Sequence, residues 1–339
     1  MEHQLKANLM RFPLLVEKST LIAEGILSLE LVHPAHEVLP SWEPGAHIEV
    51  SLPSGRRRQY SLCGEPCDRT SYKIAIGLDQ NGKGGSVEIH QTVLEGKQLE
   101  IREPRNNFQL HPAAEYLFVA GGIGITPIVP MIHAVAQAQK PWRLYYGGRS
   151  LASMAFCEEL RALGSNVVIW PQDENGLMDI EGVVAAHASG SSEASVYCCG
   201  PEGLLRAALE SCETLQTRQP LHFERFSSDL ALLSQQPTAR TPTTTAETSQ
   251  DTDFEVELYR SGTVLKVPAE RSLLDVVREA APDIPYSCEE GHCGTCETTV
   301  IDGTPAHNDI FLTDEEKASG KTMMICVGRS KTPRLVLDI

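Results

Sequence analysis

The chain has 339 residues, of which 41% are hydrophobic and 22% charged, a balance typical of a globular protein with two or three domains. Asp and Glu (45) outnumber Lys and Arg (29), and the net charge of −16 argues against nucleic acid or an anionic membrane surface as a partner. No apolar run approaches the roughly 20 residues of a membrane span, and the N-terminus lacks a secretory pattern, so we expect a cytoplasmic protein with no membrane partner.

The first third of the chain is predicted to be an antiparallel β-barrel domain, residues 1–112. Short runs with strand-like composition are separated by Gly, Pro, Asn and Asp, which is typical of antiparallel barrels and sandwiches. One short helix is expected at 86–93. The predicted strands are 26–32, 47–53, 58–62, 72–78 and 98–103.

The middle third, residues 113–228, alternates strands with helices and is predicted to be a doubly wound parallel α/β domain. Such sheets bind ligands at the carboxyl ends of their strands, where three glycine-containing segments fall. The predicted strands are 115–122, 143–148, 167–171 and 195–200. The predicted helices are 127–139, 154–163, one near 181–188 and one from Pro201.

Residues 229–252 are predicted to be a linker, because their Thr, Ser, Pro and Gln content has no hydrophobic period. The last part of the chain, 253–339, is predicted to be a small α+β domain. It holds two strand-like runs that form a hairpin, a helix at 271–280, and further strands after a cysteine-rich loop. These strands are 254–259, 263–268, and runs near 297–301, 322–326 and 334–338.

The ten cysteines are distributed unevenly. An even number suggests disulfides, but that framework is typical of short secreted chains. Four of them follow the spacing C-x4-C-x2-C-x29-C, the plant-type [2Fe–2S] pattern: Cys288, Cys293, Cys296 and Cys326. The other six are scattered: Cys63, Cys67, Cys157, Cys198, Cys199 and Cys212.

Two other interpretations of the four clustered cysteines are weaker. A zinc ribbon would use two C-x2-C pairs, and only one is present. A redox C-x-x-C would stand in a thioredoxin-like βαβ context, which is missing. Gly291 and Gly294 would let the loop wrap a cluster, and His292 is expected at the surface or as a tuner of the cluster.

The segment CEEGHCGTC resembles the cysteine loop of the phthalate dioxygenase reductase and vanillate demethylase reductase family. Chloroplast ferredoxins usually have Arg where Glu289 stands. The resemblance extends over nearly the whole chain in the family's order, which implies a flavin barrel, a nicotinamide domain and a C-terminal β-grasp ferredoxin domain.

The run Arg58-Gln59-Tyr60-Ser61-Leu62 matches the family's R-x-Y-S-L motif. The resemblance implies that Arg58 pairs with the flavin phosphate, Tyr60 packs on the ring, and Ser61 reaches toward N5. It also implies FMN, although the residues themselves are compatible with FAD. Arg56 and Arg57 equally fit a solvated edge.

A glycine-rich turn precedes the predicted helix at 86–93. Gly84, Gly85 and Ser86 would bring a phosphate to the helix N-terminus, although a plain hairpin turn has the same composition.

The glycine turn after the first parallel strand predicts a nucleotide pyrophosphate site. It matches the G-G-x-G-x-T-P turn of ferredoxin reductase-like proteins, and its residues are Gly121, Gly122, Gly124, Thr126 and Pro127. It is not G-x-G-x-x-G, which disfavours an ordinary dehydrogenase.

The run Cys199-Gly200-Pro201 follows the fourth parallel strand, and the resemblance places Cys199 beside the nicotinamide carbon that gives up hydride. A small buried thiol is the alternative. Ser61 and Cys199 are therefore the expected catalytic residues.

Two further positions are candidates for cofactor contact. Arg149 and Ser150 are expected beside the adenosine ribose, where an Arg-Ser pair suits the 2′-phosphate of NADPH, whereas relatives of the family mostly use NADH. Phe226 stands where related reductases place an aromatic over the flavin, and a core Phe on a terminal strand is the alternative.

The resemblance implies an oxidoreductase that passes electrons from NADH or NADPH through FMN to a [2Fe–2S] cluster and on to a terminal oxygenase. A monomer is expected. Residues 251–339 carry 17 Asp and Glu against 9 Lys and Arg, a net charge of −8, which suits docking on a basic oxygenase surface. The alternatives are a stand-alone reductase of soluble acceptors and a non-enzymatic redox sensor.

Overall fold

The computed structural model divides the chain into two compact units, Met1–Phe226 and Ser227–Ile339. It describes residues 11–80, 82, 84–188, 194–215, 221–226, 253–282, 284–286, 289, 291, 294–309 and 311–339. The predicted linker 229–252 lies outside the described residues, as do Cys288 and Cys293. No helix of the described residues has the length and apolar character needed to cross a membrane.

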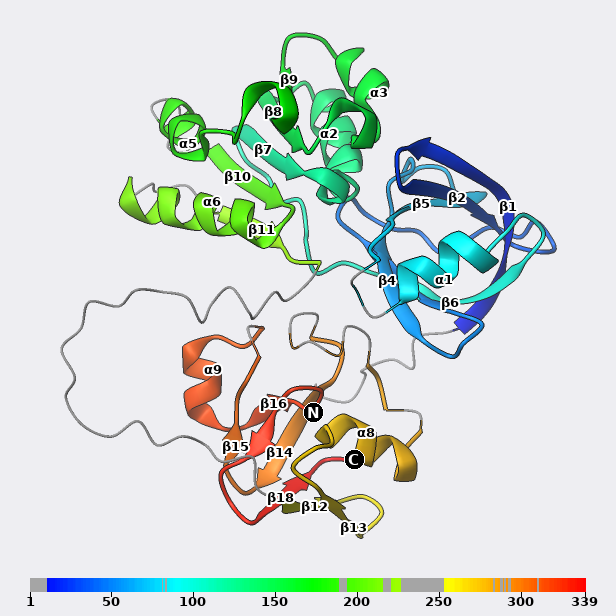
Figure 1. Cartoon of the computed structure of the whole chain (residues 1–339), viewed down its shortest axis with the longest axis vertical. Helices are drawn as coiled ribbons and strands as arrows, with labels where there is room; N and C mark the ends of the chain where they lie inside the picture. The colour runs from blue at the N-terminus through cyan, green and yellow to red at the C-terminus, as the bar shows by residue number, and fades with distance from the viewer. Residues whose placement is uncertain are drawn as a thin grey trace. The chain divides into compact units, whose positions relative to one another are not determined.

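The first part of the N-terminal unit is a six-stranded antiparallel sheet in the order β4-β3-β6-β1-β2-β5. Its strands are β1 (Arg11–Ala23), β2 (Ile26–Val32), β3 (His47–Ser51), β4 (Arg57–Ser61), β5 (Ser71–Gly77) and β6 (Gln98–Arg105). The two edge strands meet where Leu62 bridges Ile74 and the Cys63 amide donates to the Lys73 carbonyl at 2.9 Å. This contact closes the sheet into the predicted barrel (Figure 1).

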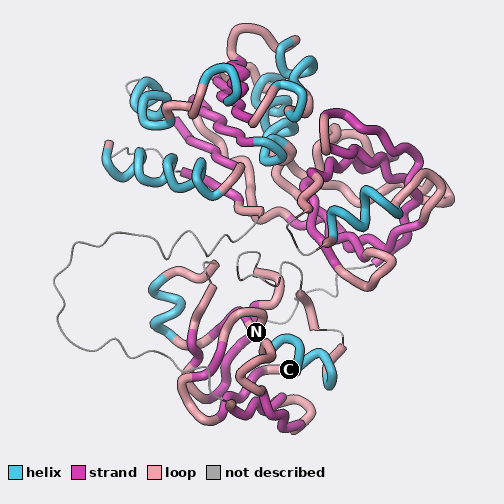
Figure 2. Tube along the Cα trace, viewed as in Figure 1, coloured by secondary structure: helices cyan, strands magenta, loops and turns pink. Residues whose placement is uncertain are grey.

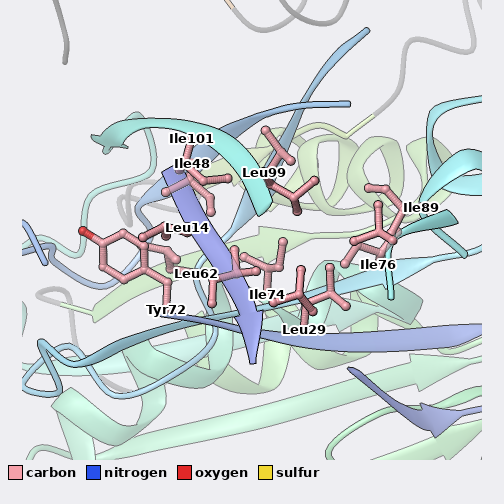
Figure 3. Packing of buried hydrophobic residues seen from close by; sticks show 14 of the residues in the cluster. Leu14, Leu29, Ile48, Leu62, Tyr72, Ile74, Ile76, Ile89, Leu99 and Ile101 are labelled. Carbon is pink, nitrogen blue, oxygen red and sulfur yellow. The ribbon is translucent and has the colours of Figure 1, made fainter. Parts of the chain in front are cut away.

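The barrel interior is filled by branched aliphatic side chains from alternating strand positions (Figure 3). Leu29 and Leu31 on β2 point inward, and so do Ile74 and Ile76 on β5. Helix α1 (Gly85–Thr92) adds Ile89 to the same core. Each such side chain contributes roughly 1.5–3 kcal/mol when fully buried, so the core fixes the strands that carry the flavin motif.

Strand β1 has no counterpart among the predicted strands. Its pairing with β2 shifts register between Val16 and Lys18 and again between Leu21 and Ala23. A register shift of this kind interrupts the inside–outside alternation on which strand prediction depends. The other barrel strands match the predicted runs to within two residues.

The second part of the N-terminal unit is a five-stranded sheet, drawn with its strands in magenta in Figure 2. Every pair of neighbouring strands is parallel, and the order is β11-β10-β7-β8-β9. Its strands are β7 (Glu115–Gly121), β8 (Trp142–Gly148), β9 (Val167–Pro171), β10 (Ala194–Cys199) and β11 (Leu221–Glu224). The strand order reverses between β7 and β10, and ligands of such sheets bind at the carboxyl side of this switch point.

Helices cover both faces of this sheet. Alternate side chains of β7 therefore pack into two separate hydrophobic cores, one on each face. Phe118 packs with residues of α2, whereas Leu117 and Val119 pack with residues of α5 and α6. The helical elements are η1 (Gly122–Ile125), α2 (Ile128–Gln137), η2 (Leu151–Ser153), α3 (Cys157–Arg161), α4 (Gln172–Asn175), α5 (Ile180–Ala188) and α6 (Glu202–Thr214).

The predicted helix 154–163 is wrong in extent, since only Cys157–Arg161 are α-helical. Met154 is extended and lies against Gly148, where an added Cβ would meet the Met154 side chain at 2.3 Å. Phe156 has a left-handed backbone with φ of 62°, and its ring lies under the Lys73 amine at 5.5 Å. These contacts interrupt the helix that the composition predicts.

The C-terminal unit is a mixed sheet in the order β13-β12-β18-β14-β16. Its strands are β12 (Phe254–Leu258), β13 (Thr263–Val267), β14 (Glu297–Asp302), β16 (Thr322–Met324) and β18 (Arg334–Leu337), with β15 (Pro305–Ala306) paired to β17 (Arg329–Ser330). Helix α8 (Leu273–Ala280) buries Leu273, Leu274, Val276 and Val277 against the sheet. Helix α9 (Asp314–Ser319) has a Thr313/Glu316 capping box.

Candidate active site

The predicted phosphate contact is assembled from β4 and the N-terminus of α1. An added Cβ at Gly85 would lie 2.6 Å from Nε of Arg58, so the guanidinium group passes directly over this glycine. Gly84 caps the helix with φ of 81° and has open space where a side chain would stand. Bare amides at a helix N-terminus beside a guanidinium group fit a phosphate group.

The three consecutive arginines have different surroundings. Arg56 is paired with Glu88 of α1 at 3.3 Å, whereas Arg58 is the one that reaches Gly85. The Ser86 hydroxyl accepts from the Asp79 amide at 3.0 Å and lies 3.2 Å from the Asp79 carbonyl. Ser86 therefore holds the glycine turn with its hydroxyl group, and its contribution to a phosphate would come from its backbone amide.

Tyr60 lies on the core-facing side of β4, beside the position of Arg58. It packs against the barrel core while remaining partly exposed, and burial raises the pKa of its hydroxyl. A half-buried aromatic ring at the barrel surface fits the predicted contact with a flavin ring.

The two glycine turns of the nicotinamide region pack backbone against backbone. A Cβ at Gly124 would lie 2.3 Å from the carbonyl oxygen of Cys199, and a Cβ at Gly200 would lie 2.9 Å from the Gly121 backbone. Gly122 has φ of 53° and open space on its outer side. These closely packed glycine turns at the β7–β10 switch point, with open space at Gly122, fit a pyrophosphate group.

Thr126 and Pro127 support this turn. The Thr126 side chain is buried, and its hydroxyl donates to the Ile123 carbonyl at 3.0 Å. Pro127 is the N-cap of α2. Both residues therefore fix the conformation that presents the glycine amides.

Arg149 and Ser150 follow β8 at the same edge of the sheet. Arg149 is exposed, and its carbonyl accepts from the Asp173 amide at 3.0 Å. Ser150 forms a capping box with Ser153. The edge thus carries the predicted guanidinium group and also the first residues of α4, which include Asp173 and Glu174.

A carboxyl group that the sequence did not single out lies between the two predicted catalytic residues. Glu224 is opposite Cys199 in the β10–β11 register. The Ser61 hydroxyl hydrogen-bonds to the Glu224 carboxyl group, whose Oε2 is buried without a hydrogen-bond partner within the described part of the chain. Barrel and parallel sheet therefore meet at one cluster formed by Ser61, Cys199 and Glu224.

The protonation states of this cluster follow from burial. Burial raises the pKa of Glu224 from 4.5 to about 8, against the smaller opposite effect of the hydrogen bond from Ser61. Burial, together with the Glu224 charge, also raises the pKa of the Cys199 thiol. Near neutral pH both groups are protonated, so Cys199 acts as a small uncharged side chain and Glu224 as a proton donor.

Phe226 follows this cluster by two residues and is 39% exposed. This exposure is larger than that of a core side chain, so the alternative of a buried terminal-strand Phe is wrong. An exposed aromatic side chain two positions after Glu224 fits the predicted cover for a flavin ring.

In the C-terminal unit, strand pairing brings together the two described cysteines of the predicted cluster. Cys296 precedes β14 and Cys326 follows β16, and Glu297 pairs with Met324. The Ile325 amide donates to the Cys296 carbonyl at 3.5 Å, and both cysteines are buried. Two buried cysteines that flank adjacent strands, 30 positions apart in sequence, fit ligands of one iron–sulfur cluster.

The glycines of the cysteine loop are required by their surroundings. Gly291 and Gly294 have φ of 76° and 70°. A Cβ at Gly291 would lie 2.7 Å from Val327, the neighbour of Cys326, and one at Gly294 would lie 2.3 Å from the Phe311 ring. The loop is thus packed tightly against the segment that carries the fourth cysteine.

Comparison with known proteins identifies the two domain types. The oxidoreductase NAD-binding domain family matches residues 118–210, and the 2Fe-2S iron-sulfur cluster binding domain family matches residues 256–331. The second match covers Cys288, Cys293, Cys296 and Cys326. The chain is therefore an oxidoreductase with nicotinamide, flavin and [2Fe–2S] cofactors, the flavin following from the reductase fold described below.

Relatives match over nearly the whole chain. Phthalate dioxygenase reductase of Burkholderia cepacia is 37% identical over 327 residues, 94% of each chain. Vanillate O-demethylase oxidoreductase of Pseudomonas sp. is 37% identical over 331 residues, 96% of this chain and 99% of the relative. A solved structure of phthalate dioxygenase reductase, described as modular for electron transfer from pyridine nucleotides to [2Fe–2S], has a TM-score of 0.73 and 35% identity, and the match covers 97% of this chain and 98% of that one. With this identity and coverage, the chain belongs to the family of phthalate dioxygenase reductase and vanillate O-demethylase reductase.

Proposed function

We propose that this chain is the reductase component of a multicomponent oxygenase of the Rieske type, passing electrons from NADH or NADPH through FMN to a [2Fe–2S] cluster and on to the terminal oxygenase. One observation carries the proposal: Gly124 packs on the Cys199-Gly200 backbone while Ser61 reaches Glu224 beside it. This packing supports a flavin bound at the barrel motif beside a nicotinamide bound at the turns of the sheet. Relatives named as reductases of phthalate and vanillate oxygenation support the oxygenase partner.

The residues proposed for each group come from the sequence motifs, and the geometry supports those that the structure describes. For FMN we propose Arg58, Tyr60, Ser61, Gly84, Gly85, Ser86 and Phe226. For the nicotinamide coenzyme we propose Gly121, Gly122, Gly124, Thr126, Pro127, Arg149, Ser150, Cys199, Gly200 and Pro201. For the cluster we propose the thiolates of Cys288, Cys293, Cys296 and Cys326.

When bound, the flavin links the two-electron chemistry of the coenzyme to the one-electron chemistry of the cluster. The chain's own residues would orient the cofactors and exclude water from the site. The Cys199 thiol stays uncharged, and Gly122 leaves open space beside the backbone of the first glycine turn. Glu224, protonated near neutral pH, holds a proton within hydrogen-bond reach of the Ser61 hydroxyl, and this pair supplies or accepts the proton that accompanies reduction.

We propose the domain division 1–112, 113–228, 229–252 and 253–339 for these functions, with a monomeric, cytoplasmic protein. The acidic C-terminal region would meet a basic surface of the oxygenase, because the net charge of −8 over residues 251–339 favours encounter with a positive surface.

The experiment that tests the proposal is a two-acceptor assay on a Cys326→Ser variant. Loss of one cluster ligand should lower NADH-driven reduction of cytochrome c by at least about 100-fold, because that acceptor takes single electrons from the cluster. Reduction of ferricyanide, which the flavin can serve directly, should remain within about threefold of wild type.

The matched control is Cys67→Ser, which changes an exposed cysteine of the N-terminal unit and should leave both activities unchanged. Equal retention of both activities in Cys326→Ser would favour a stand-alone reductase with a structural cluster. Absence of NADH oxidation by the wild-type holoprotein would favour a redox sensor and contradict the proposal.

A further inference from the structure

A two-point ion pair joins the segments on either side of the proposed nicotinamide site. Nε of Arg225 lies 3.0 Å from Oε2 of Glu202, and Nη2 of Arg225 lies 3.4 Å from Oε1. The side chains are 17% and 12% exposed. The Arg225 guanidinium group also lies over the Phe223 ring at 4.8 Å. Two hydrogen bonds and a ring contact fix this arginine in one orientation.

Each partner is adjacent in sequence to residues of the proposed site. Glu202 is in the first turn of α6, directly after Cys199-Gly200-Pro201. Arg225 stands between Glu224 and Phe226. The pair therefore ties the segment that ends β11 to the turn that ends β10.

The Glu202–Arg225 ion pair lies just beyond the last residue of β11 that pairs with β10. Strand β11 ends at Glu224, whose partner in the register is Cys199, the last residue of β10. Arg225 and Phe226 lie beyond this register.

A second ion pair on the same helix shows what an ordinary surface pair looks like. Arg206 and Glu210 are 3.8 Å apart and 53% and 67% exposed. Such exposed pairs contribute little to stability, whereas a mostly buried, bidentate pair is costly to break from one side. The Glu202–Arg225 pair thus has the geometry of a fixed anchor.

We propose that the Glu202–Arg225 pair is a positioning device for electron transfer from the coenzyme, holding the Glu224 carboxyl group and the Phe226 ring in register with Ser61 and Cys199. Neither member of the pair touches the reacting atoms. The inference rests on the proposed function, since it assigns the pair to the hydride-transfer step of that reaction.

The test is rapid-mixing absorbance of the flavin-loaded holoprotein after addition of NADH. Arg225→Gln and Glu202→Gln should each lower the rate of flavin reduction at saturating NADH about tenfold while KM for NADH changes less than about threefold, because a misplaced acid and ring affect the reaction more than binding. Arg206→Gln and Glu210→Gln are the matched controls on the same helix and should keep the wild-type rate.

The double variant E202Q/R225Q separates positioning from folding, because it leaves no unpaired buried charge. Its rate should match that of the single variants, about tenfold below wild type, which is the non-additivity expected for partners in one contact. Arg225→Lys should recover part of the rate, since the charge remains while the two-point geometry is lost.

A folded double variant with the wild-type rate would overturn the proposal, and so would losses in the two single variants that multiply. Wild-type holoprotein that fails to reduce its flavin with NADH would instead contradict the proposed function. The two failures are therefore distinguishable in the same experiment.

Discussion

The cysteine loop of the C-terminal unit takes three of its four proposed ligands from nine consecutive residues, whereas Ser61, Cys199 and Glu224 come from three strands of the N-terminal unit. In the loop, two glycines with positive φ shape a short segment, and one strand pair adds Cys326. In the N-terminal unit, Ser61, Cys199 and Glu224 come together only when the barrel is closed and β10 and β11 are paired in the correct register.

This difference predicts different sensitivities in the two regions. A local ligand set depends on the conformation of a few residues, so strain within the loop affects it most. A centre built from distant strands depends on how closely two backbones pack, and a displacement of about 1 Å there can cost two orders of magnitude in rate.

The largest expected effect is at Gly124. In Gly124→Ala the new methyl would lie 2.3 Å from the Cys199 carbonyl oxygen and 2.6 Å from the Gly200 amide, both backbone atoms that cannot rotate away. We expect kcat/KM for NADH with ferricyanide to fall about 100-fold. Gly203→Ala, on α6 with nothing within 4 Å, is the control and should retain the wild-type value. Equal activity of the two variants would show that the backbone contact does not set the site.

The next effect is expected at Glu224. Glu224→Gln keeps the shape of the side chain but cannot give up a proton, so flavin reduction by NADH should slow by about 10- to 100-fold, measured by rapid mixing. The wild-type rate should fall as pH rises through about 8, where Glu224 loses its proton, and the variant should lack this step. A variant with the wild-type pH profile would remove Glu224 from the reaction.

Glu224 also predicts a pH dependence of stability. Its pKa is raised from 4.5 to about 8 on folding, so between these values the folded state binds more protons than the unfolded state. Wild-type stability should therefore decrease as pH rises from about 4.5 to 8, by on the order of 5 kcal/mol from this group, since each pKa unit corresponds to about 1.4 kcal/mol. Thermal unfolding of wild type and Glu224→Gln across this range should show the two curves diverging, with the variant relatively more stable at pH 8.

In the C-terminal unit, Gly294 and Gly262 form a matched pair. Both have φ near 70°, but a Cβ at Gly294 would strike the Phe311 ring at 2.3 Å, whereas Gly262 has open space. Gly262→Ala should cost only the strain of a left-handed backbone, about 1–2 kcal/mol. Gly294→Ala should cost more and lower the iron content of purified protein. Equal stability and iron content in the two variants would mean that the loop tolerates displacement of Phe311.

The smallest expected effect is electrostatic. If the acidic C-terminal domain docks on a basic oxygenase surface, raising the salt concentration from about 50 to 500 mM should slow turnover with the oxygenase by about threefold or more, because exposed charges are screened. Ferricyanide reduction by the same preparation provides the reference for other effects of salt. Oxygenase turnover that is insensitive to salt would contradict electrostatic docking.

Much of the architecture was predictable because its signals are local. The runs 26–32 and 167–171 coincide with β2 and β9, since short, mainly apolar segments between turn residues determine them. The spacing of the four cysteines predicted a [2Fe–2S] cluster, and the family match confirms this cofactor. That these four thiolates are the ligands stays a prediction, and Cys288 and Cys293 lie outside the described residues.

The rest depends on contacts that no local pattern records. Strand β1 escapes prediction because register shifts break its alternation, and the helix at 154–163 is shortened by the packing of Met154 on Gly148. Glu224 is an ordinary acidic residue in sequence. Only the β10–β11 register and the approach of the barrel place it beside Cys199 and Ser61. A carboxyl group just before an aromatic residue at the end of the last parallel strand is the signal that could have found it.

The most direct test of the account is the visible spectrum of the purified holoprotein before and after anaerobic addition of NADH, with the flavin identified by chromatography. The account predicts FMN, and bleaching of both the flavin band near about 450 nm and the iron–sulfur bands. A colourless protein, or a flavin and cluster that NADH leaves oxidised, would contradict it.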